Sequence, residues 1–359
     1  MPTFNILREI EVLDTFRTKQ VRGMFDLQMK TVRHEWSGEI PVDGKNWKIG
    51  AIVGPSGSGK TTLAKEAFPS YRFHEGSNWP DRGSLIDGFE PGLSVKQITA
   101  ALNAVGFSSP PQWLKPFHAL SNGQKFRVEL ARAILSADKG VIFDEFTSVV
   151  DRDVAKIGSA AVSKMIRRGE TPPFVAVSCH YDILDWLDPD WVFDVAKMAF
   201  EWRERRRFPK IEIQIYRSGS KDWEIFRQHH YLSHDLAKGA QSFIATWEGR
   251  PVGFASAIHF PHPKARNMKK EHRVVVLPDF QGVGIGNRLS EWLGNYYKSK
   301  GYRYVSTSSN PAMIHHRAKS LAWNLTRFGR TARLGKTGKA SFSRTVACNR
   351  ITASFEYTG

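Results

Sequence analysis

The sequence predicts an α/β protein of two domains. Two glycine-rich turns each stand between an apolar strand and an amphipathic helix, GPSGSGKTT at residues 54–62 and QGVGIGN at residues 281–287. Such turns bring backbone N–H groups to a phosphate. The length of 359 residues also favours two domains over one.

The distribution of charge divides the chain near residue 200. Residues 1–200 hold 24 Lys and Arg against 24 Asp and Glu, which leaves 28 of the 52 basic and 11 of the 35 acidic residues for the second part. The net charge of +17 therefore belongs to residues 201–359, and it indicates a polyanionic partner or, more plainly, serves solubility. We expect one domain at 1–200, a basic linker at 201–210 (EWRERRRFPK) and a second domain at 211–359.

Nothing in the sequence predicts a membrane partner. No apolar run approaches the roughly 20 residues of a membrane span. The N-terminal residues mix acids and bases and do not form a signal peptide. Two cysteines give no disulfide framework, which suits a reducing compartment. We expect a cytoplasmic protein, in a bacterial cell or in a cell infected by a phage.

The first turn has the pattern G-x-x-x-x-G-K-T of a P-loop. In such a loop Lys60 would reach the β- and γ-phosphates of ATP, and Thr61 would hold Mg²⁺. A later apolar strand ends in GVIFDEF (140–146), where Asp144 suits the metal and Glu145 suits a catalytic base that orients water. The predicted ATP-binding residues of this loop are Gly54, Gly57, Ser58, Gly59, Lys60, Thr61 and Thr62.

Three further motifs follow in the order that ABC-type ATPases show. LSNGQ, at the start of 120–135, resembles their signature segment, SVVD (148–151) resembles the D-loop, and VSCH (177–180) resembles the strand that ends in the switch histidine, His180. The resemblance implies that the signature completes the ATP site of a second copy. One P-loop and one signature then require a head-to-tail homodimer. The signature residues predicted to contact ATP are Ser121, Gly123 and Gln124.

Two features depart from the ABC pattern. No glutamine stands in a convincing position between the P-loop and the signature, and Asp87 is the nearest substitute as a second metal ligand. The aromatic residue that would stack on adenine is unassigned; Trp36 is a candidate, and a place in the core is an equal alternative. With no membrane segment, the domain looks closer to ABC ATPases that act on nucleic acid or ribosomes than to transporters.

The second turn does not fit a dinucleotide fold, because its three glycines are spaced two residues apart and several strands precede it. It resembles instead the Q/R-x-x-G-x-G/A element of GNAT-family acyltransferases, within a strand order that also fits roughly residues 211–359. The resemblance implies a GNAT-like α/β domain after the ABC-type domain, with acetyl-CoA or another acyl-CoA as cofactor. The residues predicted to bind it are Val276, Leu277, Gln281, Gly282, Val283, Gly284, Ile285, Gly286 and Asn287.

Acyl transfer needs a neutral acceptor amine, so a nearby base helps. Glu271 and His272 match the place where GNAT proteins often carry one, although a lone acid in KKEHR is more often a solvated loop charge. No tyrosine stands where the family usually has its acid. Asn310, or one of His315 and His316, would substitute, or the thiolate would leave unassisted.

The predicted acceptor is an amino group of a DNA or RNA base. HHYLS, GRPVGFA and EHRVVV resemble GNAT proteins with which phages hypermodify DNA, and the whole arrangement resembles ABC–acetyltransferase fusions of prokaryotes and their viruses. Two alternatives stay open: an ATP-gated N-acetyltransferase for a protein or small amine, and a nucleic-acid-binding ATPase with a CoA-sensing GNAT domain. The predicted nucleic-acid contacts are Arg203, Arg205, Arg206 and Arg207.

Overall fold

A computed structural model describes residues 1–28, 31–169, 171–204, 209–230, 234–262, 265–330 and 351–359. The chain forms two compact units, each of three segments. Unit 1 comprises Met1–Asn78, Glu129–Asp151 and Val162–Phe208, and unit 2 comprises Trp79–Val128, Arg152–Ala161 and Pro209–Gly359. The segment with the signature motif thus groups with the C-terminal part. The domain boundaries expected from the sequence stay a prediction.

Unit 1 is built on a six-stranded sheet of order β4-β5-β6-β3-β7-β8. All neighbouring strands run parallel except β7 and β8. Every residue of β3 and β6 is buried, as expected for parallel strands covered on both faces. The strands are β3 (Ile49–Val53), β4 (Arg72–His74), β5 (Val141–Phe143), β6 (Phe174–Ser178), β7 (Trp191–Asp194) and β8 (Ala199–Trp202).

Helices follow the strands of unit 1 in an alternating order. The P-loop separates β3 from α2 (Lys60–Ala67), whose Leu63 packs into the core with Ile52 and Val177. The remaining helices that contribute to this unit are α5 (Asn122–Leu135), α6 (Arg152–Arg168) and α7 (Leu184–Leu187). Because α2 begins directly after the loop, its first N–H groups point back into the loop.

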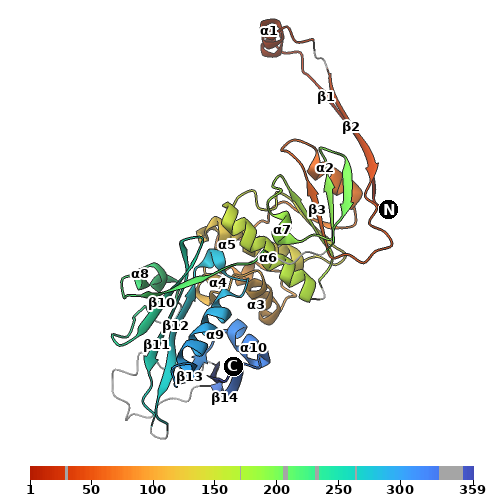
Figure 1. Ribbon diagram of the computed structural model, residues 1–359. Helices are drawn as coiled ribbons and strands as arrows, with labels where there is room; N and C mark the ends of the chain where they lie inside the picture. The colour runs from red at the N-terminus through yellow and green to blue at the C-terminus, as the bar shows by residue number, and fades with distance from the viewer. Residues whose placement is uncertain (29–30, 170, 205–208, 231–233, 263–264, 331–350) are drawn as a thin grey trace. The chain divides into compact units, whose positions relative to one another are not determined.

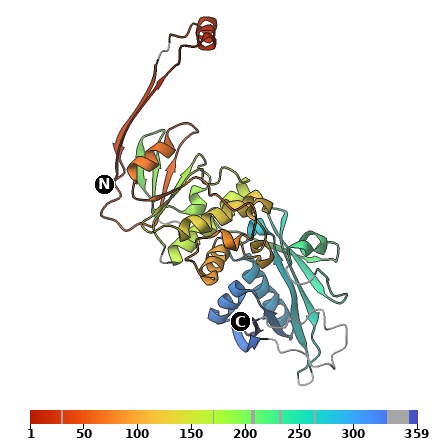
Figure 2. The ribbon, with the colours of Figure 1, turned by 180° about the vertical axis from the view of Figure 1, so that it is seen from behind.

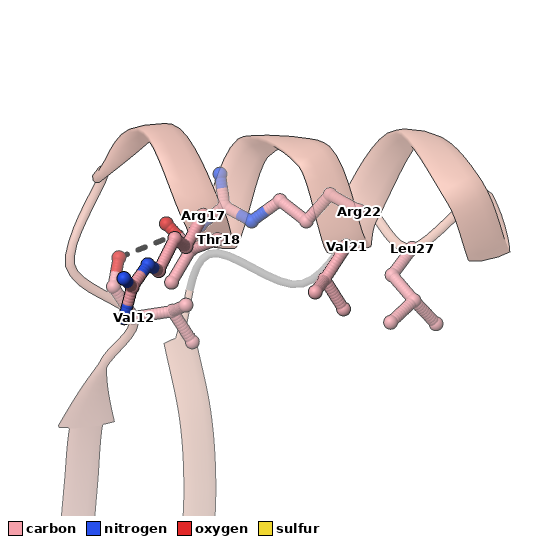
Figure 3. Close-up of a pocket in the computed structure, with 6 residues that line it drawn as sticks. All are labelled: Val12, Arg17, Thr18, Val21, Arg22 and Leu27. Atoms are coloured by element: carbon pink, nitrogen blue, oxygen red, sulfur yellow. Dashed lines mark hydrogen bonds between the residues drawn. The ribbon is translucent and has the colours of Figure 1, made fainter.

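A long hairpin precedes the sheet of unit 1. β1 (Thr3–Glu11) and β2 (Thr31–Glu39) pair antiparallel, and α1 (Phe16–Phe25) lies at the far end of the hairpin (Figures 1 and 2). α1 has no buried residue. The apolar side chains exposed along the hairpin are Leu7, Leu13, Phe16, Val21, Met24, Phe25 and Leu27. Some of them line a small hollow beneath α1 (Figure 3).

Unit 2 contains a seven-stranded sheet of order β14-β15-β13-β12-β11-β10-β9, in which only β12 and β13 are parallel neighbours. Its strands are β9 (Gln214–Ser218), β10 (Gln241–Trp247), β11 (Arg250–His259), β12 (Met268–Val276), β13 (Arg303–Ser308), β14 (Trp323–Arg330) and β15 (Ile351–Tyr357). β10 and β11 meet at Glu248 and Gly249, both with positive φ, which is the geometry of a tight hairpin turn. β10 and β11 pair antiparallel on either side of this turn.

Besides the first part of α6, the helices of unit 2 fall into two groups. α3 (Val95–Ala104), α4 (Pro110–Trp113) and the first residues of α5 form a helical segment, with short 3₁₀ turns at Ile86–Gly88 and Phe117–Ala119. α8 (Trp223–Phe226), the turns Arg227–His229 and Pro278–Phe280, α9 (Ile285–Lys298) and α10 (Pro311–Lys319) belong with the sheet. α9 packs against β11, β12 and β13 and buries Leu289 and Leu293. No helix in the described ranges is long and apolar enough to cross a membrane.

Candidate functional site

The loop between β3 and α2 has the shape of a phosphate cradle. Gly57 and Gly59 have φ values of 78° and 85°, which only glycine adopts without strain. The Lys60 ammonium lies inside the loop, where Nζ donates to the carbonyl of Pro55 at 2.7 Å. The Ser58 Oγ is buried and finds no hydrogen-bond partner among the described residues. A polyphosphate would satisfy this hydroxyl and the first amides of α2, so the loop fits ATP.

Thr61 and Asp144 form the predicted metal pair. Thr61 Oγ1 donates to the two carboxylate oxygens of Asp144 at 2.9 and 3.2 Å. Asp144 is 9% exposed. Burial raises its pKa, and the Thr61 hydrogen bond opposes this only in part. A divalent cation held by these oxygens would compensate the buried negative charge, so the pair fits Mg²⁺.

Glu145 directly follows Asp144 beyond the end of β5 and is exposed. Its backbone has a positive φ of 49°, an uncommon conformation for a glutamate. The Ser148 hydroxyl donates to its carboxylate at 2.5 Å, which links Glu145 to the SVVD segment. His180 lies two residues beyond β6, and its N–H donates to the Ser178 hydroxyl at 3.1 Å. Both candidates therefore lie at the carboxyl ends of neighbouring strands, as the motifs predict.

Trp36 lies beside the P-loop. Its ring approaches to 3.4 Å the position that a Cβ on Gly59 would occupy. The same side chain packs against the apolar core of unit 1. Both interpretations left open by the sequence, a stacking surface for adenine and a core residue, are compatible with this position.

The signature residues begin α5 in unit 2. The Ser121 N–H donates to the Gln124 side chain at 3.1 Å, and the Gln124 N–H donates to the Ser121 hydroxyl at 3.4 Å, so these two residues cap the helix. Asp87 is exposed and accepts a hydrogen bond from Ser84 at 2.6 Å. Because the P-loop belongs to unit 1, the predicted ATP contacts of Ser121, Gly123 and Gln124 and the metal contact of Asp87 stay predictions.

The second turn also has the shape of an anion cradle. Gly282 and Gly284 have φ values of 95° and 100°. Gly284 is the N-cap of α9, and no side chain caps the helix there. The Asn287 Oδ1 in the first turn of α9 is buried without a partner among the described residues. The first backbone N–H groups of α9, which no side chain caps, and the positive end of this 14-residue helix fit a pyrophosphate, whereas the Asn287 oxygen is an acceptor and does not bind an anion.

β12 and β13 separate next to this cradle. Their pairing covers only Met268 with Arg303 through Lys270 with Val305, although β12 continues to Val276. The edge of β12 that faces away from β11 is therefore open over its last residues. The N–H of Leu277 donates to Val252 in β11 at 2.9 Å, and alternate residues face opposite edges, so Val276 faces the open edge.

This alternation limits how Leu277 could contact acyl-CoA. Leu277 cannot pair with the pantetheine arm through its N–H, which is committed to β11, and its carbonyl already accepts from Phe280 at 3.0 Å. Val276 keeps the predicted position, although its carbonyl accepts from the Gln281 side chain at 2.9 Å. Val274, which the sequence interpretation missed, faces the same edge two residues earlier. The signal for it is the strand period of two.

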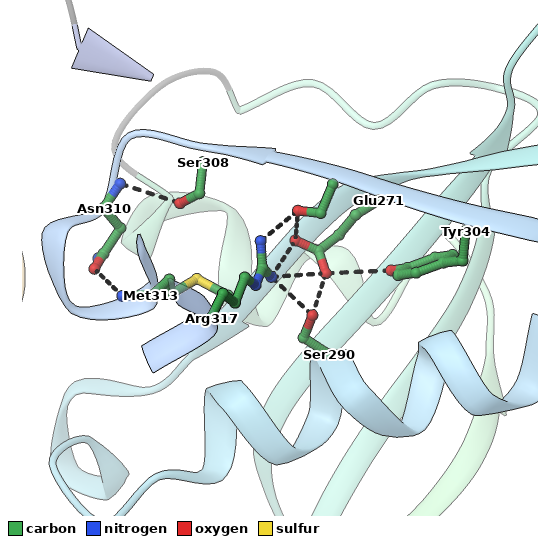
Figure 4. Close-up of polar contacts among 8 residues, drawn as sticks. Glu271, Ser290, Tyr304, Ser308, Asn310, Met313 and Arg317 are labelled. Atoms are coloured by element: carbon green, nitrogen blue, oxygen red, sulfur yellow. Dashed lines mark hydrogen bonds and ion pairs between the residues drawn. The ribbon is translucent and has the colours of Figure 1, made fainter. Parts of the chain in front are cut away.

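Glu271 is the centre of a buried polar network (Figure 4). Arg317 donates to its carboxylate at 2.9 and 3.2 Å. Hydroxyls of Ser306 and Tyr304 add hydrogen bonds at 2.6 and 3.2 Å, and Ser290 contributes another. Burial would raise the pKa of Glu271, but the Arg317 charge and these hydrogen bonds outweigh it and lower the pKa. A carboxylate with a lowered pKa, both of whose oxygens already accept hydrogen bonds, is unsuited to remove a proton. The structure therefore does not support Glu271 as the base.

His272 is the extra residue of a β-bulge. Ser256 of β11 pairs with Arg273 and Ala257 pairs with Glu271, which leaves His272 between them. The N–H of Ala237 donates to its Nε2 at 3.1 Å. Burial, with the charges of Arg273 and Lys270, lowers the pKa of His272 to about 4. The ring is neutral at pH 7 but a weak base.

Asn310 caps a helix. Its Oδ1 accepts from the N–H groups of Ala312 and Met313 at 2.9 and 3.2 Å at the start of α10. Figure 4 shows the bond to Met313. His316 contacts the Glu291 carboxylate at 2.9 Å. These roles are structural, and a catalytic role for Asn310 stays a prediction.

Of the four arginines predicted to contact nucleic acid, the structure describes Arg203 alone. The Arg203 side chain is 10% exposed, and its guanidinium pairs with Asp185 at 3.1 Å. Its guanidinium therefore already has a carboxylate partner in unit 1, and its predicted contact with a phosphate is not supported. Arg205, Arg206 and Arg207 lie outside the residues that the structure describes.

Comparisons with known proteins support both resemblances, to GNAT acetyltransferases and to ABC-type ATP-binding proteins. The profile of the Acetyltransferase (GNAT) family matches residues 196–319. The zinc import ATP-binding protein ZnuC of Pseudomonas aeruginosa is 30% identical over 215 residues, which cover 53% of this chain and 77% of that protein. The putative ATP-binding protein YdiF of Bacillus subtilis is 30% identical over 134 residues, and this chain spans only 20% of its length.

Two solved acetyltransferase structures match part of this chain. The ribosomal-protein-S18-alanine N-acetyltransferase of Escherichia coli is 18% identical, with a TM-score of 0.31, and the match covers 41% of this chain and 93% of that chain. An acetyltransferase of Bacillus subtilis in complex with CoA is 10% identical, with a TM-score of 0.32, and the match covers 42% of this chain and 99% of that chain.

Proposed function

Because this chain belongs to the ABC-type ATP-binding proteins and also carries a GNAT acetyltransferase domain, we propose that it couples ATP hydrolysis to acyl transfer from acetyl-CoA. The observation that carries the proposal is the presence of two phosphate cradles with different surroundings. One cradle adjoins the metal pair Thr61 and Asp144, which suits a nucleotide that is hydrolysed. The other adjoins an open strand edge at Val276, which suits an extended pantetheine arm.

ATP hydrolysis would use the residues around the first cradle. Lys60 and the loop amides would hold the phosphates, and Thr61 with Asp144 would hold Mg²⁺, which neutralises charge on the phosphates. Glu145 would orient the attacking water, because it is exposed and follows the metal ligand at the strand end. We propose that the signature of a second copy completes this site, so that hydrolysis requires a homodimer.

Acyl transfer forms a bond between the acceptor nitrogen and the thioester carbonyl carbon and breaks the bond from that carbon to sulfur. The nitrogen loses a proton and the CoA thiolate leaves. Glu271 is engaged by Arg317, and His272 is a weak base, so little in this site would deprotonate an alkylammonium ion. An exocyclic amino group of a nucleobase is already neutral at pH 7 and needs no such step before attack. This supports a nucleobase over a lysine as the acceptor.

The excess of positive charge also supports a nucleic-acid substrate. The sequence after residue 200 holds 28 basic and 11 acidic residues, from totals of 52 and 35. Such a surface attracts phosphates irrespective of base sequence. A transferase that acts on a base has to reach it outside the stack, and closure of an ATP-driven dimer would supply the work of clamping the strand or extruding the base. The resemblance of three sequence segments to GNAT proteins with which phages modify DNA is part of the same proposal.

The experiment is to incubate the protein with Mg²⁺, ATP and radiolabelled acetyl-CoA, together with duplex DNA, single-stranded DNA, tRNA or a protein mixture. We expect label in nucleic acid, and hydrolysis of that nucleic acid to nucleosides should recover it on a base. Label in protein alone would favour the ATP-gated protein acetyltransferase. Binding of acetyl-CoA without transfer to any acceptor would favour the CoA-sensing ATPase.

A further inference from the structure

Arg127 donates hydrogen bonds to backbone carbonyls at the start of the second glycine-rich turn, residues 281–287, which we call the acyl-CoA turn. This arginine belongs to α5, the helix that begins with the signature segment, and its side chain is 1% exposed. Nη2 donates to the carbonyl of Asp279 at 2.8 Å, and Nη1 donates to the carbonyl of Gln281 at 3.1 Å. All three residues belong to unit 2. A helix of the ATPase motif and the start of the acyl-CoA turn are thus joined by direct hydrogen bonds.

The loop between α3 and α4 closes on the same contact. Arg127 Nη1 also donates to the carbonyl of Val105 at 2.6 Å. Gly106 has a φ of 87°, and a Cβ there would lie 2.2 Å from Arg127 Nη1 and 2.5 Å from the Gln281 carbonyl oxygen. The N–H of Ser108 donates to the Gln281 side chain at 3.3 Å. Glycine is therefore required at position 106, because any side chain would separate the arginine from the turn.

A second helix contacts the next residue of the turn. A Cβ on Gly282 would lie 2.9 Å from the Ala161 side chain of α6 and 3.0 Å from the Gly106 Cα. At the start of α5, a Cβ on Gly123 would lie 3.1 Å from the Asp279 carboxylate. The turn is packed on this side without space for added atoms.

The buried guanidinium of Arg127 keeps its positive charge and its hydrogen-bond partners. A buried guanidinium is costly unless hydrogen bonds and opposite charge compensate it. Three carbonyl oxygens accept from Arg127, and the Asp279 carboxylate is near. Burial lowers the pKa of Arg127 to about 10, and the Asp279 charge opposes the decrease. The guanidinium is therefore protonated at neutral pH and cannot leave the three carbonyls without a large cost.

We propose that Arg127 is a positioning residue for acyl-CoA and that it makes acyl-CoA affinity depend on the ATP state. The inference rests on the proposed function. With the carbonyls of the turn held by Arg127, the N–H groups that follow Gln281 are presented to the pyrophosphate. Ser121 and Gly123 begin the same helix and would contact ATP of a second copy. A displacement of α5 when the ATP dimer closes then changes the turn that binds acyl-CoA.

The first test uses the unmodified chain. Calorimetry gives the Kd of acetyl-CoA with and without Mg²⁺ and a non-hydrolysable ATP analogue. We expect the two values to differ by a factor between about 5 and 150, and acetyl-CoA should change the Kd of the analogue by the same factor, because coupling is reciprocal. Equal values would overturn the coupling. A chain that binds no acetyl-CoA at all would instead count against the proposed function.

The second test uses Arg127→Met, which keeps bulk and removes the donors. We expect the ATP analogue still to bind and acetyl-CoA to bind more weakly, while the coupling factor falls to about 1. Arg127→Lys should restore part of the coupling because an ammonium can reach one of the carbonyls. Arg250→Met is the matched control, because Arg250 is 63% exposed and pairs with Asp153 of α6 without touching the turn. Coupling retained in Arg127→Met would overturn the proposal. Should that variant fail to fold by circular dichroism, Gly106→Ala separates the same atoms and carries the same expectation.

Discussion

The carboxylate of Glu271 lies 2.9 Å from the guanidinium of Arg317, and both side chains are almost fully buried, at 8% and 1% exposure. The Arg317 guanidinium also lies over the Trp323 ring, 4.5 Å from its centroid. This pair joins β12 to α10 across the splayed strands. It therefore stabilises the packing of α10 against β12 and is not free to take a proton from an acceptor.

We expect Glu271→Gln to destabilise unit 2 by about 3 kcal/mol, because removing one partner of a buried ion pair leaves the other charge uncompensated. The matched control is Glu224→Gln. Glu224 also pairs with an arginine, Arg227, but the two side chains are 63% and 48% exposed. Exposed pairs contribute about 0–1 kcal/mol. Denaturant unfolding measures both. An unfolding curve unchanged by Glu271→Gln, together with a large loss of acyl transfer, would return Glu271 to the role of a base.

Features set by a short local pattern were predictable from the sequence, and contacts between distant residues were not. The P-loop, Asp144 and the second glycine turn were predictable because each is a short pattern in a fixed context. The Glu271 network was not, because Arg317 lies 46 residues away and only folding brings it to β12. The contact of Arg127 with Asp279 spans 152 residues. Main-chain pairing of the pantetheine arm with the Leu277 N–H is excluded by its bond to Val252, and this was not predictable because which residues of a strand face an open edge depends on its pairing with the neighbouring strand.

We expect the stability of unit 2 to fall in mild acid because of His272. Its pKa is about 4 in the folded chain and near 6.5 when exposed to water. The unfolded chain therefore binds the proton more readily, and the stabilising contribution, complete above pH 6.5, is lost as the pH falls through 6.5 towards 4. Thermal unfolding at pH 7.5 and 5.0 measures the loss.

His272→Gln should make unfolding less sensitive to pH over this range. His315→Gln is the control, because His315 is an exposed histidine of α10 and its replacement removes no half-buried ring. If the two variants lose stability equally with acid, the assignment to His272 is wrong.

Gly284→Asp should weaken acetyl-CoA binding by more than about tenfold, the factor that corresponds to 1.4 kcal/mol. The residue caps α9 with a φ of 100°, so a side chain is strained there and a carboxylate repels the pyrophosphate. Gly301→Asp is the control. Its φ is 77°, nothing lies within 4 Å of an added Cβ, and it follows the other end of α9. Calorimetry on both variants decides, and similar affinities would place the acyl-CoA site elsewhere.

Lys60→Ala should abolish ATP binding, because no other ammonium lies within the described P-loop. Glu145→Gln should keep ATP binding and slow hydrolysis by roughly 10²–10⁴-fold, the usual contribution of a general base. With ATP retained, this variant should accumulate as a dimer in light scattering. A monomer of Glu145→Gln at saturating ATP would exclude the head-to-tail arrangement, whatever the hydrolysis rate.

Binding of nucleic acid should depend steeply on salt. The excess of positive charge belongs to residues 201–359, and each Lys or Arg on a duplex phosphate releases counterions, which lowers affinity by roughly 0.9 log unit per log unit of salt. Fluorescence anisotropy of the full chain with labelled duplex DNA or tRNA, at several salt concentrations, gives the slope. Neutralising Arg205, Arg206 and Arg207 together should reduce the slope and weaken binding similarly for all sequences, because phosphate contacts carry no base information. Arg203→Gln is the comparison: its guanidinium is already paired with Asp185, so we expect an unchanged slope. A response that does not vary with salt would leave the charge as a solubility feature and favour a protein or small-molecule acceptor.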